Sequence, residues 1–316
     1  MTGDGTTGGT RAIRTVLGDV DPADLGVCDA HDHLFIASTK LPGQELDDPA
    51  AATAELAAFA ALGGQAVAQW TPHGLGRRVA DVVAASKATG VHVIAATGFH
   101  QTAHYDPAVV DRVGDRFTEL FISELTEGIR DDAGAESVRA GMIKVAGAFH
   151  QLDGHARRTM AAAAEAHHAT DAPIAVHLEH GTAPLDVLDW LCDTHGVPPK
   201  RVILGHLNRM PDSRVHQEAA RSGAFLAFDG PSRAHHATDW RLLDALIALA
   251  EAGHTHQLLL GGDTVTADAR SSTGGGPGMP FLLRVLRPRI ERELGVDAAE
   301  AIYVDNPARA FAARWR

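Results

Sequence analysis

Short runs of apolar, β-prone residues alternate along the chain with longer alanine-rich stretches, and the alternation repeats eight times. The longer stretches have helical spacing of apolar positions and end in glycine, as at residues 49–62 before Gly63 and 77–89 before Gly90. Near-continuous apolar strands separated by helices are typical of a parallel sheet covered on both faces. The eight predicted strands are residues 27–34, 65–70, 92–98, 142–146, 173–177, 201–206, 224–229 and 257–262.

Eight strand–helix units predict an α/β fold of the (β/α)8, or TIM, barrel type. The alternative is an open, doubly wound sheet, but no Gly-x-Gly-x-x-Gly motif follows the first predicted strand. The Gly/Thr-rich start of the chain predicts a flexible N-terminal tail over residues 1–12. No linker or repeat interrupts the remaining sequence, so we expect residues 13–316 to form a single barrel domain.

The composition excludes several classes of protein. Of the 316 residues, 45% are hydrophobic and 22% charged, close to the globular average. No apolar run approaches the ~20 residues of a membrane span, and the first residues lack the apolar core of a secretory signal. We therefore expect a cytoplasmic protein with no membrane partner. A formal net charge of −12 disfavours nucleic acid, and two cysteines cannot build a disulfide framework or a cysteine-rich zinc site.

Candidate chemistry gathers on the predicted strands, mostly at their C-terminal ends, where barrel enzymes place their active sites. His31 and His33 are two residues apart, so on a strand both face the barrel mouth while Asp32 points away. One His-x-His pair is weak evidence among 19 histidines, but its coincidence with further polar strand ends predicts a metal site. The predicted set is His31, His33, Lys144, His177, His206 and Asp263.

Lys144 lies inside the apolar run MIKVA at 142–146 and needs a separate explanation. An ammonium group has no lone pair for a cation, but burial favours the neutral, nucleophilic amine. Such an amine can form a Schiff base with a substrate, or react with CO2 to give a carbamate, an anionic ligand able to bridge two metals. A salt bridge to a buried acid is the structural alternative. The nearby histidines and Asp263 favour the carbamate.

Longer motifs surround these positions. They are DAHDHL (29–34), GVHVIAATGFH (90–100), RAGMIKVA (139–146), VHLEHGT (176–182), VILGHLN (202–208), LLGGDT (259–264), GGPGMPFLLRVLRPRI (275–290) and DNPARAFA (305–312). In order and spacing, the chain resembles the phosphotriesterase-related family of the amidohydrolase superfamily from about Val16 to Arg314. The resemblance implies a (β/α)8 barrel with two divalent metal ions, Zn first and Mn, Fe or Co as alternatives.

The resemblance also implies roles for the predicted residues. His31, His33 and Asp263 would hold the more buried metal, and His177 and His206 the more exposed one. A carboxylated Lys144 would bridge the two metals together with a hydroxide. Asp263 and Lys144 are thus the predicted catalytic residues, with Asp263 accepting the proton of the attacking hydroxide.

One departure from the family pattern bears on the substrate. The efficient organophosphate hydrolases have Trp where this chain has His100, and only 5% of residues are aromatic, so a phosphotriester is not the expected native substrate. Arg233 follows the seventh predicted strand and Arg270 the eighth. His100, Arg233 and Arg270 are the predicted substrate-binding residues, since a guanidinium suits an anionic group.

The expected function is metal-dependent hydrolysis of a lactone or carboxylic ester, including an anionic or phosphorylated polar molecule. Amide hydrolysis or phosphotriester hydrolysis on the same centre is the alternative. Two hypotheses of other classes are a non-catalytic ligand-binding barrel and a Schiff-base lyase that uses Lys144. A small-molecule substrate is the expected partner, and a homodimer is the one assembly considered.

Overall fold

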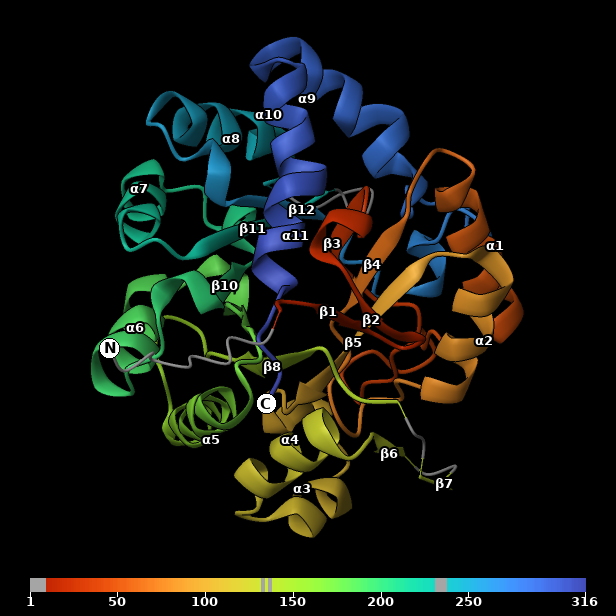
Figure 1. Ribbon diagram of the computed structural model, residues 1–316, viewed down its shortest axis with the longest axis vertical. Coiled ribbons are helices and arrows are strands. Elements are labelled where there is room, and N and C mark those ends of the chain that lie inside the picture. The colour runs from red at the N-terminus through yellow and green to blue at the C-terminus, as the bar shows by residue number, and fades with distance from the viewer. Residues whose placement is uncertain (1–9, 132–133, 136–137, 231–237) are drawn as a thin grey trace, which may run out of the picture.

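The computed structural model of the chain describes residues 10–131, 134–135, 138–230 and 238–316. Eight parallel strands form a nearly closed barrel with helices around it, and neighbours in the barrel follow the order of the chain (Figure 1). This confirms the TIM barrel, since a doubly wound sheet reverses its strand order. The barrel strands are β3 (Cys28–Asp32), β4 (Ala66–Gln69), β5 (His92–Gly98), β8 (Met142–Ala146), β9 (Ile174–His177), β10 (Val202–Gly205), β11 (Phe225–Asp229) and β12 (Leu258–Gly261).

Helices and two small hairpins complete the described part of the chain. The hairpin strands are β1 (Ile13–Thr15), β2 (Gly18–Val20), β6 (Arg130–Asp131) and β7 (Gly134–Ala135). The α-helices are α1 (Pro49–Ala60), α2 (Val79–Thr89), α3 (Pro107–Val113), α4 (Phe117–Thr126), α5 (Gly154–Thr170), α6 (Pro184–Leu188), α7 (Ser213–Arg221), α8 (Leu242–Glu251), α9 (Arg287–Leu294), α10 (Val296–Glu300) and α11 (Asn306–Phe311). None of these helices is long and apolar enough to cross a membrane.

The two helices expected from periodicity are present, with local reasons for their ends. The Asp48 carboxylate caps α1 by accepting from the backbone N–H groups of residues 50 and 51, and Pro49 occupies the first turn. Helix α2 begins at Val79, two residues later than predicted, because Arg78 has a left-handed backbone (φ 46°). It ends at Gly90, which adopts φ 74° as a C-terminal cap.

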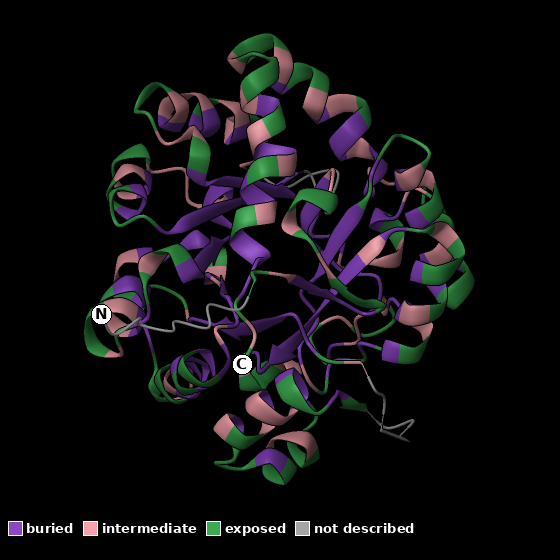
Figure 2. Cartoon of the chain, viewed as in Figure 1, coloured by how far each residue is buried: buried purple, intermediate pink, exposed green. Residues whose placement is uncertain are grey.

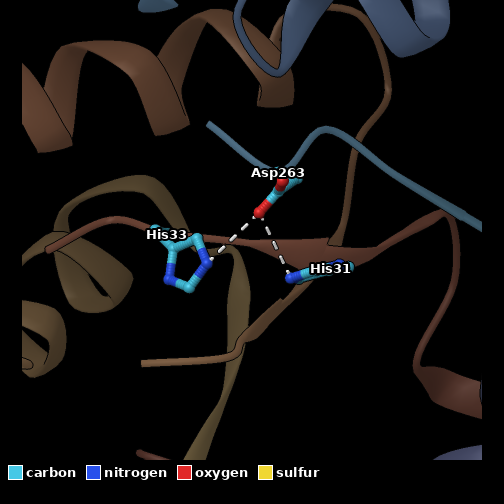
Figure 3. A group of neighbouring side chains, drawn as sticks. All are labelled: His31, His33 and Asp263. Atoms are coloured by element: carbon cyan, nitrogen blue, oxygen red, sulfur yellow. Dashed lines mark ion pairs between the residues drawn. The ribbon is translucent and has the colours of Figure 1, made fainter. Parts of the chain in front are cut away.

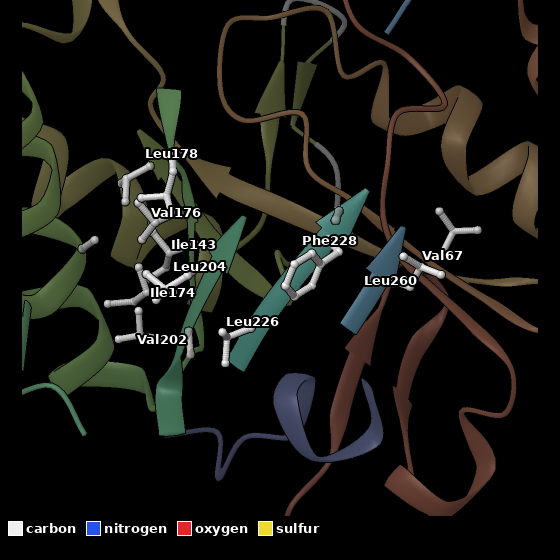
Figure 4. Close-up of a cluster of buried hydrophobic side chains, with 14 of the residues drawn as sticks. Val67, Ile143, Ile174, Val176, Leu178, Val202, Leu204, Leu226, Phe228 and Leu260 are labelled. Atoms are coloured by element: carbon white, nitrogen blue, oxygen red, sulfur yellow. The ribbon is translucent and has the colours of Figure 1, made fainter. Parts of the chain in front are cut away.

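The hydrophobic core has two layers. Larger side chains on the outer faces of the strands, such as Val176, Leu204 and Phe228, pack against the surrounding helices (Figure 4). Inside the barrel the cluster combines small residues, such as Ala68 and Ala227, with larger ones, such as Trp70 and Ile203. Burial on both faces explains why the barrel strands are almost entirely buried in Figure 2 and why their sequences are near-continuous apolar runs.

The N-terminal end of the barrel is closed by segments from both ends of the chain. Ile13, Leu25 and Phe311 belong to the interior cluster, and α11 and β1 lie across this end (Figure 1). Ala12 and Ala313 pair through their backbones, with N–O distances of 2.9 and 3.0 Å. Residues 1–9 of the predicted tail lie outside the described residues. The opposite end, where the strands terminate, carries the polar side chains.

Candidate metal centre

A β-bulge in β3 turns the first two histidines toward the barrel mouth. Between Asp29 and Asp32 the strand has one residue more than the facing segment of β4. Strict alternation from Ala30, an interior residue, would place His31 on the outer face. The extra residue changes the phase, as bulges beside active sites commonly do. His31 then stacks on the Trp70 ring, with 3.8 Å between ring centroids.

Asp229, at the end of β11, fixes the tautomers of two histidines. Its carboxylate only accepts, so the Nδ1 atoms of His31 (2.9 Å) and His206 (2.5 Å) must each carry the donated proton. Burial opposes the ionised form of Asp229, but the two neighbouring imidazoles hold its pKa well below the usual value. In the neutral form of each ring, the free lone pair therefore lies on Nε2.

His33 and His177 are also oriented by hydrogen bonds that they donate to neighbouring side chains. Thr71 Oγ1 donates its single proton to the Phe35 carbonyl (2.6 Å), so it accepts from His33 Nδ1 (2.8 Å). His177 Nε2 donates to the Glu179 carboxylate (3.0 Å), and this hydrogen bond helps to lower the pKa of Glu179 to about 2. The free lone pairs thus lie on His33 Nε2 and His177 Nδ1.

Three of the lone-pair atoms converge at one point (Figure 3). Asp263 Oδ1 lies 3.4 Å from His31 Nε2 and 3.4 Å from His33 Nε2. Burial lowers the pKa of the His33 imidazole to about 4, so the ring is neutral near pH 7. Its single proton is on Nδ1, and Nε2 therefore has none to donate to Asp263. Ligands at 2.0–2.2 Å in tetrahedral geometry around zinc are separated by about 3.4 Å, so these residues fit a metal ion.

A second pair of lone pairs meets beside the first group. His206 Nε2 and His177 Nδ1 lie 2.7 Å apart. Burial lowers the pKa of both imidazoles, so neither ring is protonated at both nitrogens near neutral pH. Two acceptor atoms at this distance repel each other unless a cation lies between or beside them. This pair could hold a second metal ion.

Lys144 follows Met142 by two residues and points into the same barrel interior. Its side chain is buried, and burial lowers its pKa to about 7 although Asp263 and Glu179 act through space to raise it. Its charge in turn helps to lower the pKa of His33 and His177, which places it beside both groups of histidines. A substantial fraction of neutral amine is thus present near pH 7. None of the described residues makes an ion pair with Lys144 within 4.0 Å.

His206 and Asp263 have left-handed backbones, with φ of 64° and 51°. Non-glycine residues rarely adopt this conformation, and it concentrates at functional sites. Around Asp263 the chain is tightly constrained, because its N–H donates to the His31 carbonyl at 2.9 Å. A Cβ on Gly261 would lie 2.4 Å from the same carbonyl oxygen, so only glycine allows β12 to approach β3 this closely.

The predicted substrate-binding residues are placed differently from one another. His100 is buried with its ring 4.6 Å from that of His177, and its Nδ1 has no hydrogen-bond partner among the described residues. Arg270 is buried and donates to the Leu34 carbonyl. Arg233 lies outside the described residues. Their roles in substrate binding stay predictions.

The sequence did not indicate the residues that orient the histidines. Asp229 ends the predicted strand 224–229, so the strand-end rule could have found it. Thr71 and Glu179 had no comparable signal, because their importance comes only from contacts with His33 and His177. Arg209 was also missed, and its guanidinium donates to Asp263 Oδ2.

A nearly closed parallel barrel with these groups at the C-terminal ends of its strands defines a TIM-barrel enzyme. Residues 11–311 match the phosphotriesterase family, and the chain belongs to this family. A phospho-furanose lactonase of Mycoplasmopsis synoviae is 29% identical over 329 residues, covering 95% of this chain and 91% of the relative.

Solved structures support the same assignment. A lactonase from Listeria monocytogenes is 28% identical, with a TM-score of 0.88 over 95% of this chain and 98% of that chain. A variant organophosphorus hydrolase from Deinococcus radiodurans is also 28% identical, with a TM-score of 0.83 over 98% and 100% of the two chains. The protein is accordingly a hydrolase of the phosphotriesterase family, as its motifs predicted.

Proposed function

We propose that the protein hydrolyses a lactone or carboxylic ester at a centre of two divalent metal ions. The observation that carries the proposal is the convergence of possible ligand atoms in the barrel mouth. Asp263 Oδ1 faces two imidazole nitrogens at 3.4 Å, and His177 Nδ1 faces His206 Nε2 at 2.7 Å. His31, His33 and Asp263 would hold one ion, and His177 and His206 the other. Zinc suits this donor set, and Mn, Fe or Co are alternatives.

Lys144 is proposed to act as a carbamate. Its buried amine, with a pKa of about 7, can react with CO2 near neutral pH, and the resulting anion would offset the charge of the two cations. When bound, the two metal ions would acidify a water molecule and polarise the carbonyl oxygen of the substrate. The chain's own residues then orient the ligands and handle the proton.

Asp263 is the proposed acid–base residue. Its carboxylate accepts the proton released as the water attacks and returns it to the leaving oxygen. Asp229, Thr71 and Glu179 hold the imidazoles in the tautomers that leave the inner nitrogens free. The buried surroundings exclude bulk water from these groups and strengthen their electrostatic interactions.

The proposed substrate is a lactone with an anionic or phosphorylated group. Two relatives are named as lactonases, one of them for phospho-furanoses, and His100 replaces the Trp of efficient organophosphate hydrolases. Arg233 is the proposed partner of the anionic group. Replacing it by alanine should lower kcat/KM for an anionic lactone by a factor equivalent to about 2–4 kcal/mol of transition-state stabilisation. The kcat/KM for a neutral lactone should stay nearly unchanged.

The test is a turnover screen with metal-loaded protein against phosphorylated and neutral lactones, esters, N-acyl amides and phosphotriesters. Metal analysis should find about two divalent ions per chain, and lactones should be the fastest substrates. Full activity in protein without metal would refute the proposal, and faster turnover of amides or phosphotriesters would replace its substrate class.

Lys144→Ala tests the proposed carbamate on Lys144 as a ligand shared by the two metal ions. The variant should fold, lose most activity, and regain part of it when short carboxylic acids are added with metal. Lys87→Ala, at an exposed position of α2, is the matched control and should behave like the wild type. Wild-type turnover by Lys144→Ala without any additive would show that Lys144 is only structural. Trapping of Lys144 by borohydride with substrate would indicate a Schiff base instead.

A further inference from the structure

Arg209 lies in the candidate metal centre but has no part in the mechanism proposed above. It ends the short helix Leu207–Arg209 that follows β10 and His206. Its Nη2 donates to Asp263 Oδ2, and its Nε lies 3.6 Å from Asp229 Oδ2. The side chain is 14% exposed, so it borders the barrel mouth.

Because of the contact with Arg209, the two oxygens of Asp263 have different partners. Oδ1 faces the Nε2 atoms of His31 and His33 at 3.4 Å each. Oδ2 is turned to the guanidinium of Arg209, and lies 3.8 Å from His206 Nδ1. A carboxylate held in this way offers one oxygen to the histidine pair and is prevented from turning both oxygens toward it.

The charge of Arg209 is unfavourable for the metal ions proposed above. A cation a few ångströms from a divalent ion repels it, and the repulsion is strong where water is largely excluded. The guanidinium also competes with the metal for the charge of Asp263. The charge of Arg209 thus does not tighten the metal site, and the hydrogen bond that its guanidinium makes there is to Asp263.

We propose that Arg209 is a positioning residue that fixes Asp263 in a one-oxygen orientation and weakens metal binding as a consequence. The proposal rests on the proposed metal-dependent function. Without Arg209, Asp263 is free to rotate or to bind metal through both oxygens. The metal is then held more tightly, while the carboxylate is less available to accept the proton.

The experiment compares Arg209→Met, Arg209→Lys and the wild type, with Arg214→Met on the exposed side of α7 as the matched control. Zn²⁺ affinity is measured by competition with a chromophoric chelator, and kcat with a neutral lactone. Arg209→Met should bind Zn²⁺ at least tenfold more tightly and lose at least tenfold in kcat. Arg209→Lys, which retains the charge, should keep the wild-type affinity but recover only part of kcat.

Thermal unfolding gives a third measurement that does not depend on activity. Metal-free Arg209→Met should have a lower Tm than metal-free wild type, because the Asp263 carboxylate loses its partner, and added Zn²⁺ should remove the difference. Loss of a merely structural partner of a ligand typically weakens metal binding 10–100-fold, so weaker or unchanged Zn²⁺ affinity in Arg209→Met would overturn the proposal. If the wild type binds Zn²⁺ but hydrolyses no lactone, the proposed function fails while the affinity result still decides the role of Arg209.

Discussion

The Arg77–Glu124 cluster and the Arg209–Asp263 cluster both bury a guanidinium against a carboxylate near the C-terminal ends of the strands. The first lies outside the barrel, between the outer face of β5 and α4. Glu124 accepts from both Nη atoms of Arg77, from Thr97 Oγ1 at 2.6 Å and from His73 Nδ1 at 3.1 Å. Every carboxylate oxygen there has donors, and no lone pairs are left facing one another.

The second cluster, inside the mouth, is not balanced in this way. Arg209 donates to one oxygen of Asp263, but the other oxygen faces the Nε2 atoms of His31 and His33 at 3.4 Å each. Acceptors exceed hydrogen-bond donors among these residues, which fits the cation of the proposed metal centre. Burial of a charged pair therefore does not identify a site, whereas a surplus of converging acceptors is the feature on which the proposed metal centre rests.

The largest expected effect is on turnover. Asp263→Asn keeps the side-chain volume but removes an anionic ligand and the proton acceptor. We expect kcat of the metal-loaded protein to fall by roughly 10²–10⁴, and thermal stability to fall as well, because Arg209 loses its charged partner. Steady-state kinetics and thermal unfolding of the same preparation measure both. Near-normal turnover would mean that the proton leaves by another route. The Arg209–Asp263 cluster in the barrel mouth would then be as structural as the Arg77–Glu124 cluster outside the barrel.

Glu124→Gln should reduce the stability of the fold and leave turnover unchanged. The substitution leaves Arg77 buried with no charged partner, and breaking such a pair reduces the free energy of unfolding by about 3–5 kcal/mol. Urea unfolding measures the loss. Metal content and kcat per folded molecule should match the wild type. Glu127→Gln, at an exposed position that pairs with Arg130, is the control and should change stability by less than about 0.5 kcal/mol. A loss of metal in Glu124→Gln would contradict the division between the clusters.

The Arg77–Glu124 cluster outside the barrel should also make the stability of the fold depend on pH. Burial raises the pKa of Glu124, but Arg77 more than offsets this and lowers it to about 2, from an ordinary value of 4.5. A depressed pKa stabilises the fold above about pH 4.5, and the stabilisation disappears as the pH falls toward 2. The shift corresponds to about 3 kcal/mol.

The check is the difference in unfolding free energy between wild type and Glu124→Gln from pH 6 to pH 3. Metal-free protein is required, since acid also protonates the histidines of the site. The difference should shrink progressively below pH 4.5. A constant difference over this range would show that the Glu124 charge contributes nothing.

The sequence predicted the barrel well because each strand is an apolar run bounded by turn signals. All eight predicted runs contain a barrel strand, with ends shifted by one or two residues at most. The bulge in β3 was not predictable from alternation, since it arises from how β3 pairs with β4. His31 and His33 were nevertheless placed together because their two-residue spacing is a local feature.

The six predicted site residues converge in the structure because strand ends meet at one rim of a barrel. Their roles as metal ligands remain predictions. Thr71 and Arg209 could not be found from the sequence, because a common residue gains its role only from a partner brought close by the fold. Thr71 reaches His33 across 38 positions, and Arg209 reaches Asp263 across 54.

The smallest expected effect concerns such a partner. Thr71→Val removes the hydroxyl that accepts from His33 Nδ1 and so leaves the imidazole tautomer unfixed. Loss of an orienting partner of this kind weakens metal affinity by about 10–100-fold. Chelator competition with Zn²⁺ measures it, and Thr71→Ser should restore the wild-type value. Thr97→Val is the matched control, since it removes a hydroxyl from the outer cluster and should leave Zn²⁺ affinity unchanged. Equal affinities for Thr71→Val and the wild type would show that barrel packing alone orients His33.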